Sequence, residues 1–496
     1  MKQTHSQNNR MPGDRRPPWL RIIVAGCLVV CSIVILLPRA KPPPENRQFT
    51  GGSPSGDHFS GEARPESRSF LRPRAGAAEA RPAESAEEMV ARRAAQFARS
   101  RSEVLHAIAA KLNIGVPEGI KEFFAAAEAG DWEHLQAVFN RLVAERRTQP
   151  HPPELDRLWA PVLTTFNALE EVHLWPAKEY LDYGNAILDA LKPGMVYVGG
   201  TDPGRGIPEL LNETKEGEKH VVITQNGLAD NTYMDYLRFI YGDRLSVPSS
   251  EQVQSAYTGY VADYQKRLAH DQQFPDGPNQ VLPGERVGIG GGGGWTAAVK
   301  QGDQLIQVSG QVSCMMINER ILQMILEANP DSPFGLEESF PLKSTYAEAA
   351  PLGPIMELRA PDGQDALSAD SASQSVAYWQ DRVQQLLAAP AAADSPDWLR
   401  AYSKMTDAQA NLFAAHGLNA QAEQAFRLSL QICPYATDAV FGYVDLLTGP
   451  NRAEDALAVA QSAAKADPRS QAFRDLLGRL QCSAAAATGA GRKPPP

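Results

Sequence analysis

A 34-residue repeat near the end of the chain constrains the fold more than any other feature of the sequence. Ala422 and Ala456 are 34 residues apart, Pro434 and Pro468 have the same separation, and Phe426 lies eight residues before the first proline. Small, large and proline positions at this period are typical of helical hairpins that stack side by side. Because each repeat in such an array buries its apolar face only against its neighbours, we expect the two units to pack on another helix.

This spacing resembles the tetratricopeptide repeat, and the resemblance implies a helical region over residues 375–482. Proteins with such repeats use their concave surface to bind a peptide or a helix of another protein. We therefore expect a protein partner at the helices that carry the repeat. Residues 483–496 are rich in alanine and proline, which predicts a disordered tail.

The middle of the chain, residues 193–374, follows a different pattern. Short apolar stretches at 195–200, 220–224 and 304–310 alternate with helical patterns, which predicts βαβ crossovers. We expect an α/β domain with a mostly parallel, Rossmann-like sheet, and an N-terminal helical region over 86–192 before it.

Polar side chains gather after the first two of these stretches. Because ligands bind at the carboxyl ends of parallel strands in such a sheet, these side chains form the predicted ligand-binding set. Its members are Asp202, Arg205, Gln225, Asp230, Asn231 and Tyr233. Arg205 suits a phosphate or carboxylate, and Asp202 suits a sugar hydroxyl, a metal or the role of a base. Turn and helix-capping roles explain Asp202 and Asp230 equally well.

Several classes of function lack their signatures. Neither polar loop fits the GxGxxG or GxxxxGK[ST] motif, and the glycine run 288–294 carries no phosphate-loop lysine and opens no helical pattern. The sequence contains no HExxH motif, and its five cysteines lack metal-ligand spacing, so we expect neither a cofactor nor a metal. A net charge of −10 gives no case for nucleic-acid binding. Glu337 and Glu338 are adjacent, and neighbouring strand residues point to opposite faces, so we expect a solvated loop at this pair rather than a site. No catalytic residue is assigned.

The N-terminus predicts a membrane anchor. Residues 19–37 read WLRIIVAGCLVVCSIVILL, and as a helix they would extend roughly 28 Å, about the thickness of the bilayer core. A lipid-modified Cys27 is disfavoured, because too few apolar residues precede the VAGC motif. The basic residues favour a cytoplasmic segment 1–18 and a periplasmic body, joined to the span by a disordered linker over 38–85. We expect a single-pass protein of a bacterial inner membrane.

The stretches GGTDPGR and ITQNGLADNTYMDYLRFIYG resemble a family of uncharacterised bacterial membrane-anchored proteins with C-terminal tetratricopeptide repeats. The similarity covers roughly residues 155–477. More distantly, the α/β region is similar to the soluble part of protein O-mannosyltransferase-like membrane proteins. The transferase chemistry of those proteins is attributed to a multi-span portion, which this chain lacks, so the resemblance implies architecture and location but no reaction.

Two functions are consistent with these features. The first is a membrane-tethered interaction or scaffolding module of the cell envelope that binds a protein through its repeats. The alternative is a glycan- or lipid-carrier-related enzyme, or a carbohydrate-binding protein, that uses the polar loops for a small-molecule ligand.

Overall fold

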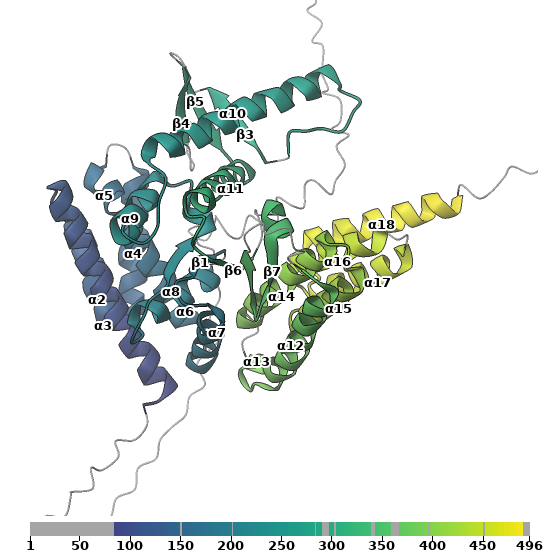
Figure 1. Cartoon of the computed structure of the whole chain (residues 1–496), viewed down its shortest axis with the longest axis horizontal. Helices are drawn as coiled ribbons and strands as arrows, with labels where there is room; N and C mark the ends of the chain where they lie inside the picture. The colour runs from purple at the N-terminus through teal and green to yellow at the C-terminus, as the bar shows by residue number, and fades with distance from the viewer. Residues whose placement is uncertain are drawn as a thin grey trace, which may run out of the picture.

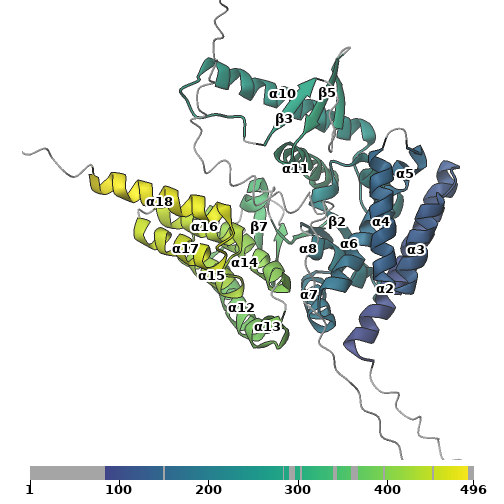
Figure 2. The same ribbon diagram turned by 180° about the vertical axis from the view of Figure 1, so that it is seen from behind.

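A computed structural model describes residues 84–148, 151–200, 202–282, 284–289, 297–301, 304–338, 343–358, 367–394, 397–449 and 452–489. These residues are mainly helical. Two groups of helices lie on either side of a small central sheet, and a second small sheet lies apart from it together with a long helix (Figure 1, and from behind Figure 2).

The N-terminal group of helices packs on one side of the central sheet. Its members are α2 (Ala86–Leu112), α3 (Glu118–Ala129), α4 (Trp132–Arg147), α5 (Pro153–Arg157), α6 (Trp159–Leu174) and α7 (Ala177–Ala190). Ser85 and Glu88 begin α2 with reciprocal side-chain to backbone hydrogen bonds, a capping box. Gly130, at φ +70°, ends α3, and the Asp131 carboxylate caps α4, so a tight turn joins the two helices.

The central sheet is mixed and has the strand order β2-β1-β6-β8-β7. Its strands are β1 (Val196–Gly199), β2 (Val221–Thr224), β6 (Phe334–Leu336), β7 (Ala349–Leu352) and β8 (Ile355–Leu358). Strand β1 runs parallel to β2 and β6, whereas β8 is antiparallel to β6 and β7. The helix α8 (Asp202–Thr214) connects β1 to β2 and packs on both. Every residue of β1, β2 and β6 is buried, as expected for parallel strands covered by helices.

A long insertion separates β2 from β6. It contains η1 (Gln225–Gly227), α9 (Asn231–Tyr241), α10 (Ser250–Gln273), β3 (Arg286–Ile289), β4 (Ala297–Gln301), β5 (Gln304–Ser309) and α11 (Gln311–Ala328). The three strands form an antiparallel sheet of order β3-β5-β4, which lies beside α10 (Figure 1).

The C-terminal group of helices packs on the other side of the central sheet. After η2 (Lys343–Glu348) and the β7–β8 hairpin come α12 (Ala369–Ala388), α13 (Ala391–Asp394), α14 (Asp397–Ala415), α15 (Asn419–Ile432), α16 (Thr437–Thr448), α17 (Ala453–Ala466) and α18 (Gln471–Gly489). Helix α18 extends beyond the predicted end of this region at residue 482, into the predicted tail.

The 34-residue repeat corresponds to helix positions. Helices α15 and α17 begin 34 residues apart, and so do α16 and α18. Ala422, Phe426 and Ala456 are buried, and Pro434 and Pro468 follow the ends of α15 and α17. Helix α12 packs against α15, which supplies the expected neighbouring helix. Membership of the tetratricopeptide class stays a prediction.

The prediction of a mostly parallel, Rossmann-like sheet is wrong. The stretch 304–310, expected as its third parallel strand, contains β5 of the separate antiparallel sheet, where it forms a hairpin with β4. The place beside β1 belongs to β6, whose three residues are too few to show a strand pattern in the sequence. Two antiparallel strands then complete the sheet, and helices dominate the whole structure.

The membrane prediction is also corrected. None of the helices in the described ranges is long and apolar enough to cross a bilayer. This finding contradicts the expected transmembrane helix, single-pass topology and inner-membrane location. The predicted segments 1–18 and 19–37, and the predicted linker up to residue 83, lie outside the described residues.

Candidate functional site

The carboxyl ends of β1, β2 and β6 meet at two adjacent glutamates. Glu337 directly follows β6, and its backbone N–H donates to Val198 O at 3.1 Å, so it continues the ladder with β1. Its side chain is 1% exposed and accepts hydrogen bonds from Gly200 N–H and Tyr183 Oη–H, both at 2.8 Å. The Glu337 carboxyl group therefore fixes the loop after β1 to helix α7.

The loop after β1 requires glycine at two positions, because the carboxyl groups of Glu337 and Glu338 leave no room there for a side chain. A Cβ atom at Gly204 would overlap the carboxyl group of Glu337, and a Cβ atom at Gly200 would overlap that of Glu338. Tyr197 Oη–H donates to Gly204 O at 2.6 Å, which holds the first turn of α8 against β1. The loop thus holds two carboxyl groups of its own chain.

Glu338 lies beside Glu337 and has polar neighbours from two other elements. The Gln225 side chain donates from Nε2 to Glu338 Oε1 at 3.4 Å, and Lys404 Nζ of α14 lies 3.5 Å from Glu338 Oε2. Asp438 of α16 lies 4.0 Å from the same Lys404 nitrogen. The site therefore joins the sheet to the C-terminal helices.

The electrostatics of the pair favour a protonated Glu338. Burial raises the pKa of Glu338 to about 7, with Glu337 and Asp438 adding to the rise and Lys404 opposing it. Burial also raises the pKa values of Tyr183 and Tyr197 well above their ordinary range, so both phenols stay neutral hydrogen-bond donors. At neutral pH the Glu338 carboxyl group can therefore either donate or accept a proton.

Of the six predicted ligand-binding residues, Gln225 lies in this site. It is 1% exposed, immediately after β2, and its amide contacts Glu338. The neighbouring Asn226 donates from its side chain to Gly200 O, which draws the ends of β1 and β2 together.

Arg205 belongs to a buried ion network instead. Its guanidinium group lies 3.5 Å from Glu209 on the same helix, and Arg101 of α2 lies 3.2 Å from the other oxygen of Glu209. All three side chains are at most 5% exposed. Burial of three charges requires mutual compensation, so the network stabilises the packing of α2 on α8 rather than presenting Arg205 to a ligand.

The remaining predicted residues have local roles, as far as the structure describes them. Asp230 caps α9 by accepting from Thr232 N–H and Oγ1–H at 2.8 and 2.7 Å. Asn231 is the exposed first residue of α9, and Tyr233 Oη accepts from Thr224 N–H at 3.0 Å. Asp202 is the first residue of α8. The capping interpretation holds for Asp230.

The expectation of a solvated loop at Glu337 and Glu338 is wrong. Both side chains contact the loop after β1, because β1 pairs directly with β6, which the two glutamates follow. The signal in the sequence is the pair of acidic residues directly after the apolar stretch Phe334–Leu336. Nothing in the sequence identifies Lys404, which arrives from a helix 66 residues later.

Within the described ranges, no three His, Cys, Asp or Glu side chains are arranged to hold a metal ion. Comparison of the chain with protein-family models, with curated proteins and with solved structures gives no match. The resemblances drawn from the sequence therefore stay predictions, and the function must be argued from the geometry of the site.

Proposed function

We propose that the chain is an enzyme of the general acid–base class, and that Glu338 exchanges a proton with a ligand bound at the carboxyl ends of β1, β2 and β6. The observation that carries this proposal is the convergence on Gly200 of the buried Glu337 carboxyl group and the carboxyl group of Glu338, whose side chain is 14% exposed. Pairs of carboxyl groups whose environments separate their protonation are a recurring arrangement in acid–base catalysis.

The two glutamates have different roles in this proposal. Glu337 already accepts two hydrogen bonds from the protein, so it stays fixed and acts through its charge on Glu338. Glu338 has a pKa of about 7, near the optimum for proton transfer at neutral pH. Lys404 and Gln225 hold its two oxygens, Lys404 at Oε2 and Gln225 at Oε1.

The charge balance of the site suggests the class of ligand. The site contains three carboxyl groups, from Glu337, Glu338 and Asp438, and one lysine beside the last two, so an anionic ligand would be repelled. A neutral ligand with hydroxyl groups can accept from Glu338 and exchange hydrogen bonds with the amides of Gln225 and Asn226. We therefore propose a glycan as the substrate, consistent with the carbohydrate alternative from the sequence.

The test combines neutral sugars with one substitution. The full chain is screened by thermal shift against neutral oligosaccharides and assayed with nitrophenyl glycosides across pH 5 to pH 9. We expect turnover that depends on a group titrating near pH 7 and that disappears in Glu338→Gln, while the exposed control Glu348→Gln keeps it. Turnover that survives in a folded Glu338→Gln variant would refute the proposal, as would failure of every glycan to bind or react.

A second function, binding of a protein through the C-terminal helices, is favoured by one observation. The inner helices of this group already pack on the chain's own sheet: Gln409 of α14 donates to Gly353 O and Ile355 O at 2.9 and 3.0 Å. The 34-residue repeat continues outward to α18, which packs against α17. We propose that a partner binds at this outer end.

A photocrosslinking amino acid at exposed Arg474 of α18 tests this second proposal, with the same label at exposed Glu103 of α2 as the control. We expect one discrete adduct from position 474 alone. Equal labelling at both positions would refute a specific interface on α18.

A further inference from the structure

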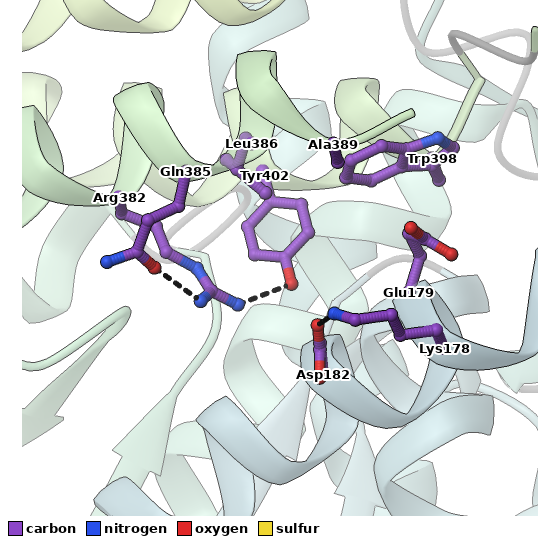
Figure 3. A pocket seen from close by; sticks show the side chains of 9 residues that line it. All are labelled: Lys178, Glu179, Asp182, Arg382, Gln385, Leu386, Ala389, Trp398 and Tyr402. Atoms are coloured by element: carbon purple, nitrogen blue, oxygen red, sulfur yellow. Dashed lines mark hydrogen bonds and ion pairs between the residues drawn. The ribbon is translucent and has the colours of Figure 1, made fainter. Parts of the chain in front are cut away.

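A cavity of about 120 Å³ lies where helix α7 faces the C-terminal helices α12 and α14. Figure 3 shows side chains converging on it from both sides, with Arg382 and Trp398 on the C-terminal helices and Glu179 and Asp182 on α7. The lining consists of Lys178, Glu179, Asp182, Arg382, Gln385, Leu386, Ala389, Trp398 and Tyr402. None of these residues belongs to the Glu338 site.

Glu179 is a carboxylate in the cavity wall without an ion pair among the described residues. Its residue is 8% exposed, and its carboxyl group has no hydrogen bond or ion pair with any residue that the structure describes. The nearby cation does not compensate it, because Lys178 Nζ binds Asp182 at 2.5 Å. A carboxylate that lines a cavity and lacks an ion pair leaves this wall with an uncompensated negative charge, which favours a positive group in the cavity.

On the other wall of the cavity, the Arg382 guanidinium group lacks an anionic partner among the described residues. Its guanidinium group donates to Gln385 Oε1 at 3.2 Å and to Tyr402 Oη at 2.9 Å, two neutral acceptors, and no described carboxylate lies within ion-pairing distance. Its Nε atom is buried without a hydrogen-bond partner among the described residues. The guanidinium group therefore keeps an unused capacity for an anion.

We propose that this cavity binds a small zwitterion, such as a free amino acid, with its ammonium group at Glu179 and its carboxylate at Arg382. Glu179 and Arg382 line one cavity with opposite charges, yet they do not pair with each other. A ligand that carries both charges satisfies both walls at once, whereas a ligand with one charge leaves the other wall uncompensated. The ring of Trp398 also lines the cavity and provides aromatic surface for the ammonium group, whereas the Tyr402 ring already lies under the Arg382 guanidinium group, 5.2 Å from its centroid.

The experiment measures binding of amino acids and of their single-charge analogues to the full chain. Glycine, L-alanine, L-serine, β-alanine and 4-aminobutyrate vary the separation of the charges, and isothermal titration calorimetry at neutral pH reports the affinity. For the zwitterion that binds most tightly, the amide lacks the carboxylate charge and the N-acetyl derivative lacks the ammonium charge. We expect each analogue to bind roughly tenfold more weakly or worse, since a charge-assisted hydrogen bond contributes about 1.5–3 kcal/mol.

Two variants assign each charge to its wall. In Glu179→Gln the N-acetyl derivative should bind as well as the zwitterion, because the ammonium group has lost its partner. In Arg382→Gln the amide should bind as well as the zwitterion. The exposed substitutions Asp189→Asn on α7 and Gln384→Ala on α12 should leave every affinity unchanged.

Glu338→Gln should also leave zwitterion binding unchanged, which separates this proposal from the proposed glycan chemistry. The proposal is overturned if no zwitterion binds at millimolar concentration to the folded chain. It is equally overturned if the folded Glu179→Gln and Arg382→Gln variants discriminate among the three ligand forms as the wild-type chain does.

Discussion

Gly204→Ala tests the arrangement of the glutamate pair without changing any charged or hydrogen-bonding group. Gly204 lies in helix α8 and has no positive φ angle, so its backbone tolerates alanine. In an ordinary helix interior this change stabilises by up to about 1 kcal/mol. At this position the new methyl group would occupy the space of the Glu337 carboxyl group, which must therefore move.

The expected magnitude follows from the contacts that Glu337 would lose. Displacement of its carboxyl group breaks the hydrogen bonds from Gly200 N–H and Tyr183 Oη–H, both buried. Each of the two buried donors left without an acceptor costs about 1–3 kcal/mol, so the net destabilisation after the helix gain is about 1–5 kcal/mol. The entropy of unfolding is about 2.1 cal/mol/K per residue, so for a chain of this size the destabilisation corresponds to a fall in the melting midpoint of roughly 1–6 °C.

Thermal and urea unfolding of the full chain measure this effect. Gly478→Ala on α18 is the matched control, because that helical glycine is exposed and a Cβ atom there meets nothing within 4 Å. We expect the control to be neutral or slightly stabilising. The double variant Gly204→Ala/Glu337→Ala should be less destabilised than the sum of its single changes, because the clash is then absent. A Gly204→Ala protein as stable as Gly478→Ala would refute the described position of Glu337.

Three further predictions concern the buried polar groups of the described chain. Glu209→Gln leaves Arg101 and Arg205 buried without their shared carboxylate, and we expect a loss of about 3–5 kcal/mol in the free energy of urea unfolding. Gln409→Ala removes the acceptor of Trp379 Nε1–H and the donor to two backbone carbonyls of the β7–β8 hairpin, so we expect hydrogen exchange at that hairpin to accelerate before exchange in β1. The pKa of Glu338 is higher in the folded chain than its ordinary value of 4.5. This group therefore contributes stability that is fully present below pH 4.5 and is lost as the pH rises through about 7. Across this range the free energy of unfolding should decline in the wild-type chain, and this decline should be absent in Glu338→Gln.

Features set by neighbours in the sequence could be predicted, because their causes are local. The capping box at Ser85, the turn at Gly130 and the 34-residue offset of the C-terminal helices each depend on a few adjacent residues or on a helical period. The same reasoning anticipated the capping role of Asp230 as an alternative to ligand binding. Gln225 was placed correctly near a strand end because β1 and β2 are neighbouring parallel strands joined by one helix.

The rest of the site depends on pairing between distant segments. Residues 334–336 become a central strand only because β1 and β8 lie on either side, and this places Glu337 against Gly200 across 137 residues of sequence. The more strand-like stretch 304–310 pairs instead with its nearest neighbour, β4. Local hydrophobic pattern does not distinguish these outcomes, so the carboxylate pair could not be located without the sheet order.

Charged side chains of the C-terminal helices shift the pKa of Glu338, and this gives those helices a role in the chemistry of the site. Lys404 of α14 lies between Glu338 and Asp438, at 3.5 and 4.0 Å. Asp438 raises the pKa of Glu338, whereas Lys404 lowers it, so Asp438→Asn should lower that pKa and Lys404→Met should raise it. Carbon-13 NMR titration of labelled glutamate carboxyl groups measures both shifts, with exposed Glu348 as an internal reference.

Asp438 lies half-exposed at the start of α16. A protein bound there that neutralises Asp438 would therefore lower the pKa of Glu338, as Asp438→Asn does. Shifts of the same sign in the two variants would contradict this account, since a single lysine cannot then lie between the two carboxyl groups.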